Sequence, residues 1–137
     1  MEKNEPSLPD TNTILRYLLN DEPDLAARAG TYWESVREGS IKATLTEGVL
    51  MECVYVLQCF YKVPRDRIVT SLSRIISFKG LSHESLDFFS ASLEIYGSTN
   101  FDFVDCMLAA RELNNDGFVF TFDDKLNSYI SRNKDHK

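Results

Sequence analysis

Four carboxylates occupy similar local settings at widely separated places in this sequence. Asp10 closes the first apolar segment, and Glu52, Asp105 and Asp123 each have apolar neighbours. Burying a lone carboxylate is costly, so four such residues indicate one shared pocket that holds a cation. A pocket of this kind would suit chemistry on phosphates.

The first two acids differ in how well an ordinary structural role would explain them. Asp10 could cap a helix, although Thr11 and Asn12 could do so as well. Glu52 has no basic residue three or four positions away, so no salt bridge along a helix explains it. A solvated helix face is the alternative for Glu52. Nearby Glu47 fits a capping box and is therefore assigned a structural role.

The last two acids each have a neighbour that could compete for the same role. Asp102 lies at the N-terminus of an expected helix, where its charge interacts favourably with the helix dipole. Asp105 lies deeper in the same helix. We therefore expect Asp105 to be the principal ligand and Asp102 to support it. Asp123 is preferred to Asp124, which fits a solvent-facing helix cap. Thr121 could offer a hydroxyl to the same pocket, and Asn12 is expected to support Asp10.

Hydrophobic periodicity predicts an alternating series of strands and helices that would position these acids. The expected strands are residues 7–11, 41–43, 78–81 and 118–122. The expected helices cover about residues 13–19, 23–38, 45–62, 64–76, 82–97, 100–114 and 125–132. Such alternation predicts an α/β fold with a mostly parallel central sheet covered by helices on both faces. Ligands bind beyond the carboxyl ends of such strands, where Asp10 and Asp123 would lie.

Composition suits one compact domain over residues 7–132, between a frayed tail at 1–6 and a basic tail at 133–137. The chain has 137 residues, 43% of them hydrophobic, and no apolar run long enough to span a membrane. The polar N-terminus does not resemble a secretory signal. Three cysteines without zinc-motif spacing predict reduced core residues and a cytoplasmic protein.

Several kinds of site are disfavoured by the sequence. It contains neither a P-loop nor a dinucleotide-binding glycine motif, so the sequence does not indicate a nucleotide-binding site. His83 and His136 fall in a connection and in the tail, which argues against a histidine-dependent triad or a histidine-rich zinc site. The formal net charge of −6 argues mildly against nucleic acid as a partner, but acids that bind metal would weaken that argument.

Four segments together resemble the PIN-domain ribonuclease family, and within it the VapC-type toxins of bacterial toxin–antitoxin pairs. The matching segments are Leu8-Pro9-Asp10-Thr11-Asn12, Leu50-Met51-Glu52-Cys53-Val54-Tyr55-Val56-Leu57, Asp102-Phe103-Val104-Asp105-Cys106-Met107-Leu108-Ala109-Ala110 and Thr121-Phe122-Asp123. Their order and spacing extend the resemblance over about residues 7–130. Two departures are Pro9, where an aliphatic residue is usual, and a chain that ends soon after Asp123.

The resemblance implies a three-layer α/β/α sandwich and an endoribonuclease that depends on Mg²⁺ or Mn²⁺. It implies that Asp10, Glu52, Asp105 and Asp123 bind the metal, and that the protein forms a homodimer blocked by a small antitoxin protein. Two alternatives stay open: a non-catalytic PIN-fold binding protein, and a PIN nuclease that processes RNA without an antitoxin.

Basic residues near the expected site could contact the RNA backbone. Arg16 follows Asp10, and three more cations lie between expected helices. They are Lys62, Arg65 and Arg67. Solvated surface is the alternative explanation for all of these residues.

Overall fold

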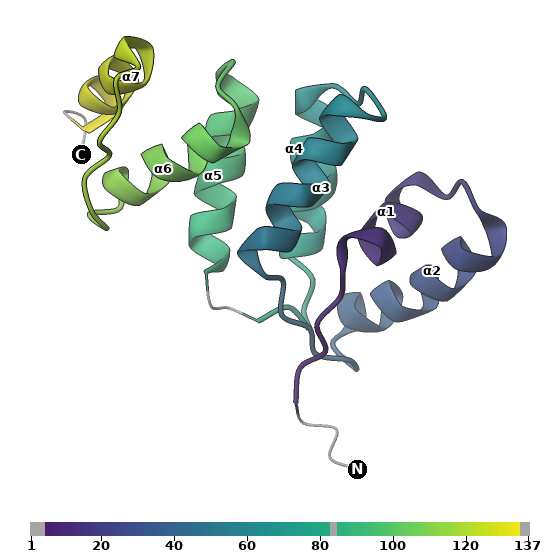
Figure 1. Ribbon diagram of the computed structural model, residues 1–137. Coiled ribbons are helices and arrows are strands. Elements are labelled where there is room, and N and C mark those ends of the chain that lie inside the picture. The colour runs from purple at the N-terminus through teal and green to yellow at the C-terminus, as the bar shows by residue number, and fades with distance from the viewer. Residues whose placement is uncertain (1–4, 83–84, 135–137) are drawn as a thin grey trace. The chain divides into compact units, whose positions relative to one another are not determined.

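The computed structural model describes residues 5–82 and 85–134, and the chain divides into two compact units, Met1–Leu86 and Asp87–Lys137 (Figure 1). We refer to these as the N-terminal unit and the C-terminal unit. The expected single domain over residues 7–132 stays a prediction. Residues 1–4 and 135–137 of the expected tails, together with His83 and His136, lie outside the described residues.

Seven α-helices account for most of the described residues. They are α1 (Thr11–Leu19), α2 (Pro23–Glu38), α3 (Glu47–Cys59), α4 (Arg65–Ile76), α5 (Leu86–Ser98), α6 (Phe103–Leu113) and α7 (Asp124–Lys134). None of the helices in the described ranges is both long enough and apolar enough to cross a bilayer.

Local signals in the sequence set the ends of α2. Pro23 occupies its first turn, where the missing N–H costs nothing because that group would have no helical partner. Gly39 ends the helix with a φ of 91°, a left-handed conformation that glycine adopts without a side-chain penalty. The predicted range of residues 23–38 is therefore confirmed.

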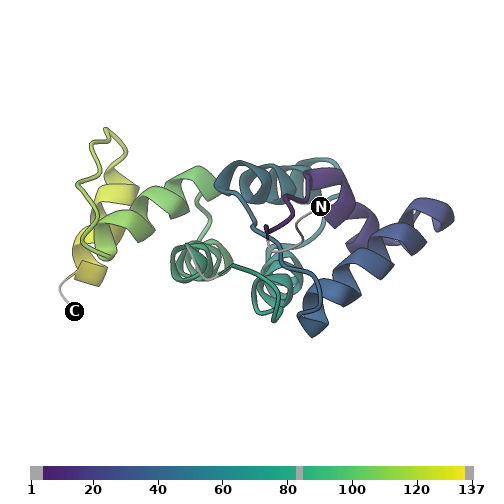
Figure 2. The same cartoon turned by 90° about the horizontal axis from the view of Figure 1, so that it is seen from below.

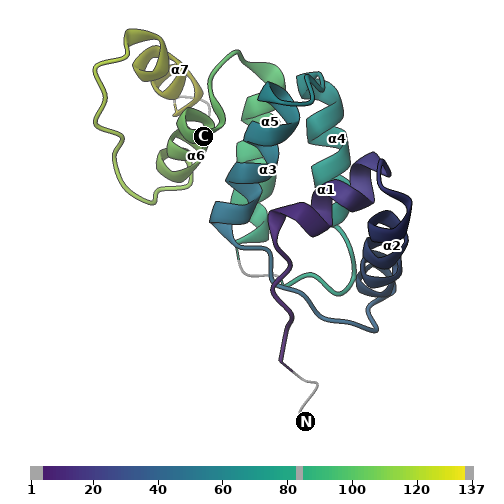
Figure 3. The same cartoon turned by 45° about the vertical axis from the view of Figure 1, so that its right-hand side comes forward.

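The core of the N-terminal unit is built around Trp33, which is fully buried on α2. Three aromatic rings surround it at centroid distances of 5.0 Å for Tyr32, 6.1 Å for Tyr17 and 6.3 Å for Phe78. Tyr17 brings α1 onto α2, and the two helices lie side by side in Figures 1 and 3. This packing holds α1, which begins directly after the first candidate acid.

The predicted α/β fold is wrong, because the described residues contain no β-sheet. Three of the expected strands are reduced to two isolated parallel bridges, Ser7 to Ala43 and Ala43 to Leu81. The three extended segments that carry them meet below the helices of the N-terminal unit in Figure 1, and Figure 2 views that end. The fourth expected strand, residues 118–122, forms no bridge.

Short pairing segments explain why no sheet forms in the described residues. Ser7 donates its N–H to Lys42 O at 2.8 Å, but Pro9 lacks an N–H to continue the ladder. Helix α1 begins at Thr11 and α3 begins at Glu47, so helical geometry takes over within a few residues of each bridge. Each extended segment therefore serves as a connection between helices and not as a layer of the fold.

The C-terminal unit packs α6 against α7 and buries a core that includes several aromatic rings. Tyr96 and Phe103 meet edge to face with ring centroids 5.6 Å apart. Phe101 and Tyr129 make a similar contact at 5.7 Å, which ties the start of α6 to the middle of α7. These contacts hold the two helix starts that carry the remaining candidate acids.

Candidate functional site

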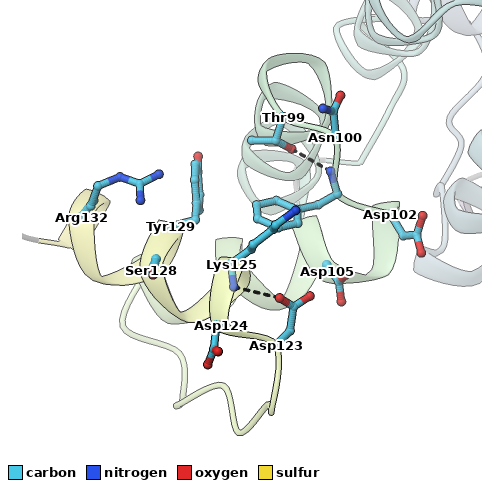
Figure 4. Close-up of a pocket in the computed structure, with 11 residues that line it drawn as sticks. Thr99, Asn100, Asp102, Asp105, Asp123, Asp124, Lys125, Ser128, Tyr129 and Arg132 are labelled. Atoms are coloured by element: carbon cyan, nitrogen blue, oxygen red, sulfur yellow. Dashed lines mark hydrogen bonds between the residues drawn. The ribbon is translucent and has the colours of Figure 1, made fainter.

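Three of the predicted acids line one pocket in the C-terminal unit. Asp102, Asp105 and Asp123 border a hollow of about 670 Å³ between the starts of α6 and α7. Figure 4 shows Arg132 and Tyr129 toward the opposite end of this pocket from Asp102. The pocket therefore combines an acidic part with a part that carries a cation and a phenol.

These three aspartates are positioned by the N-termini of α6 and α7. Asp102 precedes α6, and Asp105 lies one turn later within it. Asp123 caps α7, because its Oδ1 accepts hydrogen bonds from Lys125 N at 2.9 Å and Leu126 N at 3.2 Å. The expectation that Asp124 would be the cap is wrong, since Asp124 is the first residue of the helix.

The pKa of Asp105 shows that the aspartates of this pocket affect one another. Desolvation raises the pKa of the Asp105 carboxyl, and the negative charges of Asp102 and then Asp123 raise it further. A raised carboxyl pKa means that the charged form is disfavoured where it lies. A bound cation would relieve this repulsion.

Thr121 was expected to support the pocket, and it does so by holding the residues around Asp123. Its hydroxyl accepts a hydrogen bond from Asp123 N at 3.1 Å, and its carbonyl accepts one from Asn127 Nδ2 at 3.1 Å. Thr121 does not line the pocket but fixes the chain just before Asp123. It is therefore a positioning residue for that carboxylate.

The other two predicted acids lie together in the N-terminal unit. Asp10 caps α1 by accepting a hydrogen bond from Thr13 N at 3.0 Å. Glu52 lies on α3 and accepts a hydrogen bond from Thr11 Oγ1 at 2.5 Å. Burial first, and then the charges of Glu52 and Asp10, raise the pKa of the Cys53 thiol to about 12, so both carboxylates act on the same neighbour.

The hydrogen bond between Thr11 and Glu52 has no signature in the sequence. Thr11 reads there only as a possible helix cap, and Glu52 has no basic partner within its own helix. The two residues are 41 positions apart and meet because α1 packs against α3. Thr11 is buried but Glu52 is exposed, so the hydroxyl fixes one oxygen of a carboxylate that lies at the surface.

We expect Thr11→Val to lower the free energy of unfolding by about 1 kcal/mol, because it removes a buried hydroxyl and its hydrogen bond to Glu52 while keeping the side-chain shape. Urea denaturation of the wild type, Thr11→Val and Thr11→Ser would measure this. Thr11→Ser retains the hydroxyl and should restore most of the loss. Equal stability of Thr11→Val and the wild type would show that the hydrogen bond contributes nothing.

The predicted RNA-contacting cations have different surroundings. Arg16 is buried and pairs with Asp21 at 3.0 Å and Glu22 at 2.6 Å, and its Nη2 donates to the Tyr61 hydroxyl at 3.2 Å. The Tyr61 bond is the main cause of its raised pKa. Its charge is therefore used inside the N-terminal unit. Lys62 precedes α4, and Arg65 and Arg67 lie in its first turn. Lys62 and Arg67 are exposed, and Arg65 is half-buried.

Asp10 and Asn12 border a separate hollow of about 340 Å³ beside Arg16 and Arg28. Glu52 does not line it, although Thr11 connects Glu52 to the start of the same helix. The N-terminal unit thus holds Asp10 and Glu52, and the C-terminal unit holds Asp102, Asp105 and Asp123.

The carboxylates fit a divalent cation in donor type and charge but not in number. Oxygen ligands suit Mg²⁺ and Mn²⁺, and burial together with the charges of Asp102 and Asp123 disfavours the charged form of Asp105. Within residues 5–82 and 85–134, however, no group of three or more histidine, cysteine, aspartate or glutamate side chains is arranged to hold a metal ion. The predicted four-acid metal site therefore stays a prediction.

Comparison with known proteins gives no relative for this chain. No family model matches it, and no curated protein or solved structure is significantly similar to it. The resemblance to PIN-domain ribonucleases accordingly rests on the four sequence segments alone.

Proposed function

We propose that this protein is an endoribonuclease that requires Mg²⁺ or Mn²⁺, and that it is the toxin of a bacterial toxin–antitoxin pair. The observation that carries the proposal is the pocket of Asp102, Asp105 and Asp123, in which burial and then the charges of the other two aspartates raise the pKa of Asp105. The four sequence segments that resemble PIN-domain ribonucleases support it independently. The fold lends no support, because the sheet expected from that resemblance is missing from the described residues.

Each part of the pocket has a role in this proposal. A divalent cation, when bound, would supply an acidified water and stabilise the charge that develops on the phosphate. Asp105 and Asp123 would attract the cation, and the Asp123 backbone would be held by Thr121. Arg132 and Lys125 border the same pocket and would favour a phosphate oxygen there.

The remaining parts of the proposal come from the family resemblance and from composition. We propose a cytoplasmic homodimer, RNA as the substrate and a small antitoxin protein as the inhibitor. Cys53, Cys59 and Cys106 are all free thiols, as suits a reducing compartment. The expectation that all three are core residues is wrong for Cys59, which is exposed.

Asp10→Asn tests, with little risk to the fold, whether this function uses the predicted four-acid site and not the pocket of the C-terminal unit alone. Asparagine caps helices about as well as aspartate, so the bond from Thr13 N can survive while the charge is lost. We expect the wild type to cleave RNA with Mn²⁺ and to stop when EDTA is added. The Asp10→Asn variant should have lost most of this activity. Cleavage that continues in EDTA would overturn the metal requirement. A wild type inert on structured and unstructured RNA would favour a non-catalytic binding protein.

A further inference from the structure

Residues 118–122, which we call the phenylalanine segment, expose three aromatic rings. Phe118 and Phe120 are each 88% exposed and Phe122 is 90% exposed. Large apolar side chains grouped in this way mark interaction sites in soluble proteins. The segment connects α6 to α7 as an open loop, best seen in Figure 3.

The segment has one side turned toward its own unit. Val119 and Thr121 are half-buried between the exposed phenylalanines. Val119 N donates to Glu112 Oε1 at 2.8 Å, and Thr121 O accepts from Asn127 Nδ2 at 3.1 Å. The helices α6 and α7 thus hold the backbone groups of these alternate residues.

The other side of the segment is an open backbone edge. In an extended chain, successive residues direct their N–H and C=O groups to opposite edges and their side chains to opposite faces. The backbone groups of Phe118, Phe120 and Phe122 form no hydrogen bond within the described parts of the chain. Open backbone groups and exposed rings therefore belong to the same three residues.

Contacts at both ends fix where the segment begins and where it ends. Gly117 turns the chain into it with a φ of 106°, and Asp116 is paired with Arg111 at 2.8 Å. Lys134 lies 5.3 Å from the centroid of the Phe118 ring. The segment ends at Asp123, which is fixed as the cap of α7. A segment restrained at both ends loses less conformational entropy on binding than a free one.

We propose that the phenylalanine segment is a strand-addition site for an extended peptide of a partner protein. The partner strand would pair with the open backbone edge, and its alternate apolar side chains would lie on the three phenylalanine rings. Aromatic side chains bury roughly 150–250 Å² each, so the three rings would bury about 500 Å² on this protein. That area fits a small, reversible interface.

Charge identifies the kind of peptide. The segment itself is uncharged, but Asp116 precedes it and Asp123 and Asp124 follow it. A second copy paired antiparallel about Phe120 would place Asp116 opposite Asp124, and like charges opposite one another destabilise strand pairs. The segment therefore best suits a strand with apolar alternation and a lysine or arginine at each end.

Selection from a phage-displayed library of random peptides on the full-length protein tests this proposal, which does not depend on RNA cleavage. We expect enrichment of peptides with alternating apolar residues and basic ends. Their synthetic forms should bind the Phe118→Ser/Phe120→Ser/Phe122→Ser variant at least tenfold more weakly. The replaced rings are almost fully exposed, so circular dichroism should show an unchanged fold. Tyr55→Ser, which removes a 67% exposed ring from α3, is the control and should bind like the wild type.

Further measurements separate strand pairing from simple hydrophobic contact and from other occupants. Methylating alternate peptide nitrogens should abolish binding, because it removes the donors that a strand pair needs. No enrichment, or enriched peptides that bind the triple variant equally well, would overturn the proposal. Sedimentation showing a dimer that only the triple variant loses would assign the segment to a second copy. RNA binding lost only in that variant would assign it to RNA, and either result would overturn the proposal.

Discussion

Asp105→Asn is expected to stabilise the folded protein near neutral pH while lowering RNA cleavage about a hundredfold. The gain in stability arises because asparagine removes a carboxylate that is partly desolvated and repelled by Asp102 and Asp123. The loss of activity follows from removing one charge of the proposed cation site, since single electrostatic groups in active sites contribute factors of roughly 10² to 10³. Residues that serve an active site often lower the stability of the folded protein.

The effect of Asp105 on stability has a definite dependence on pH. The pKa of Asp105 is raised in the folded protein, so the folded state binds its proton more tightly than the unfolded state does. Below the unfolded pKa the carboxyl is protonated in both states and costs nothing. The penalty develops as pH rises through the unfolded and folded pKa values and is complete above them. The stabilisation by Asp105→Asn should therefore vanish near pH 3 and be fully present near pH 7.

Asp66→Asn provides a matched control for Asp105→Asn. Asp66 lies in the first turn of α4, as Asp105 does in α6, so both variants lose a favourable interaction with a helix dipole. Asp66 does not line the aspartate pocket. Urea denaturation should show Asp66→Asn slightly less stable than the wild type and Asp105→Asn more stable. Equal losses in both variants would show that the carboxylates of the pocket do not repel one another.

Gly80→Ala is expected to destabilise the N-terminal unit by about 3 kcal/mol or more. A Cβ at this position would overlap Ile41 O and lie 2.8 Å from Val36 O, and both of these are backbone atoms. Gly80 also donates its N–H to Val36 O at 2.8 Å and accepts from Ala43 N at 2.9 Å. Relieving the overlap would displace these hydrogen bonds and the Ala43–Leu81 bridge, and overpacking of this kind is costly.

Gly30→Ala is the control for this backbone effect. Gly30 lies inside α2, and a Cβ added there would meet no atom within 4 Å, so alanine encounters no obstacle among the described residues. Alanine also favours helix over glycine by about 1 kcal/mol. Chemical denaturation should therefore show Gly30→Ala more stable than the wild type and Gly80→Ala much less stable. Wild-type stability in Gly80→Ala would contradict the close approach at Ile41.

The helices could be predicted from the sequence because their signals are local. Pro23 and Gly39 delimit α2 within its own residues, and Pro64 immediately precedes α4 as expected. The sheet could not be judged in the same way, because strand pairing depends on residues far apart. Phe118 to Phe122 alternate as strand residues should, but nothing within that segment reveals whether a neighbouring strand exists.

The candidate acids show the same division between local and distant information. Asp102 and Asp105 are one helical turn apart, so their proximity could be read from the spacing alone. The contact of Thr11 with Glu52 required knowledge of how α1 meets α3. The capping by Asp123 was missed because two adjacent aspartates offer the same local chemistry, and only the hydrogen bonds from Lys125 N and Leu126 N distinguish them.

Trp33 gives the protein a spectroscopic reporter confined to one half of the chain. It is the sole tryptophan in the sequence, and it is fully buried among the rings of the N-terminal unit. Its fluorescence emission therefore follows the unfolding of that unit. Far-ultraviolet circular dichroism follows the helices of both units. Divergence of the two signals during denaturation would reveal that the units unfold separately, whereas coincident transitions would indicate one cooperative fold.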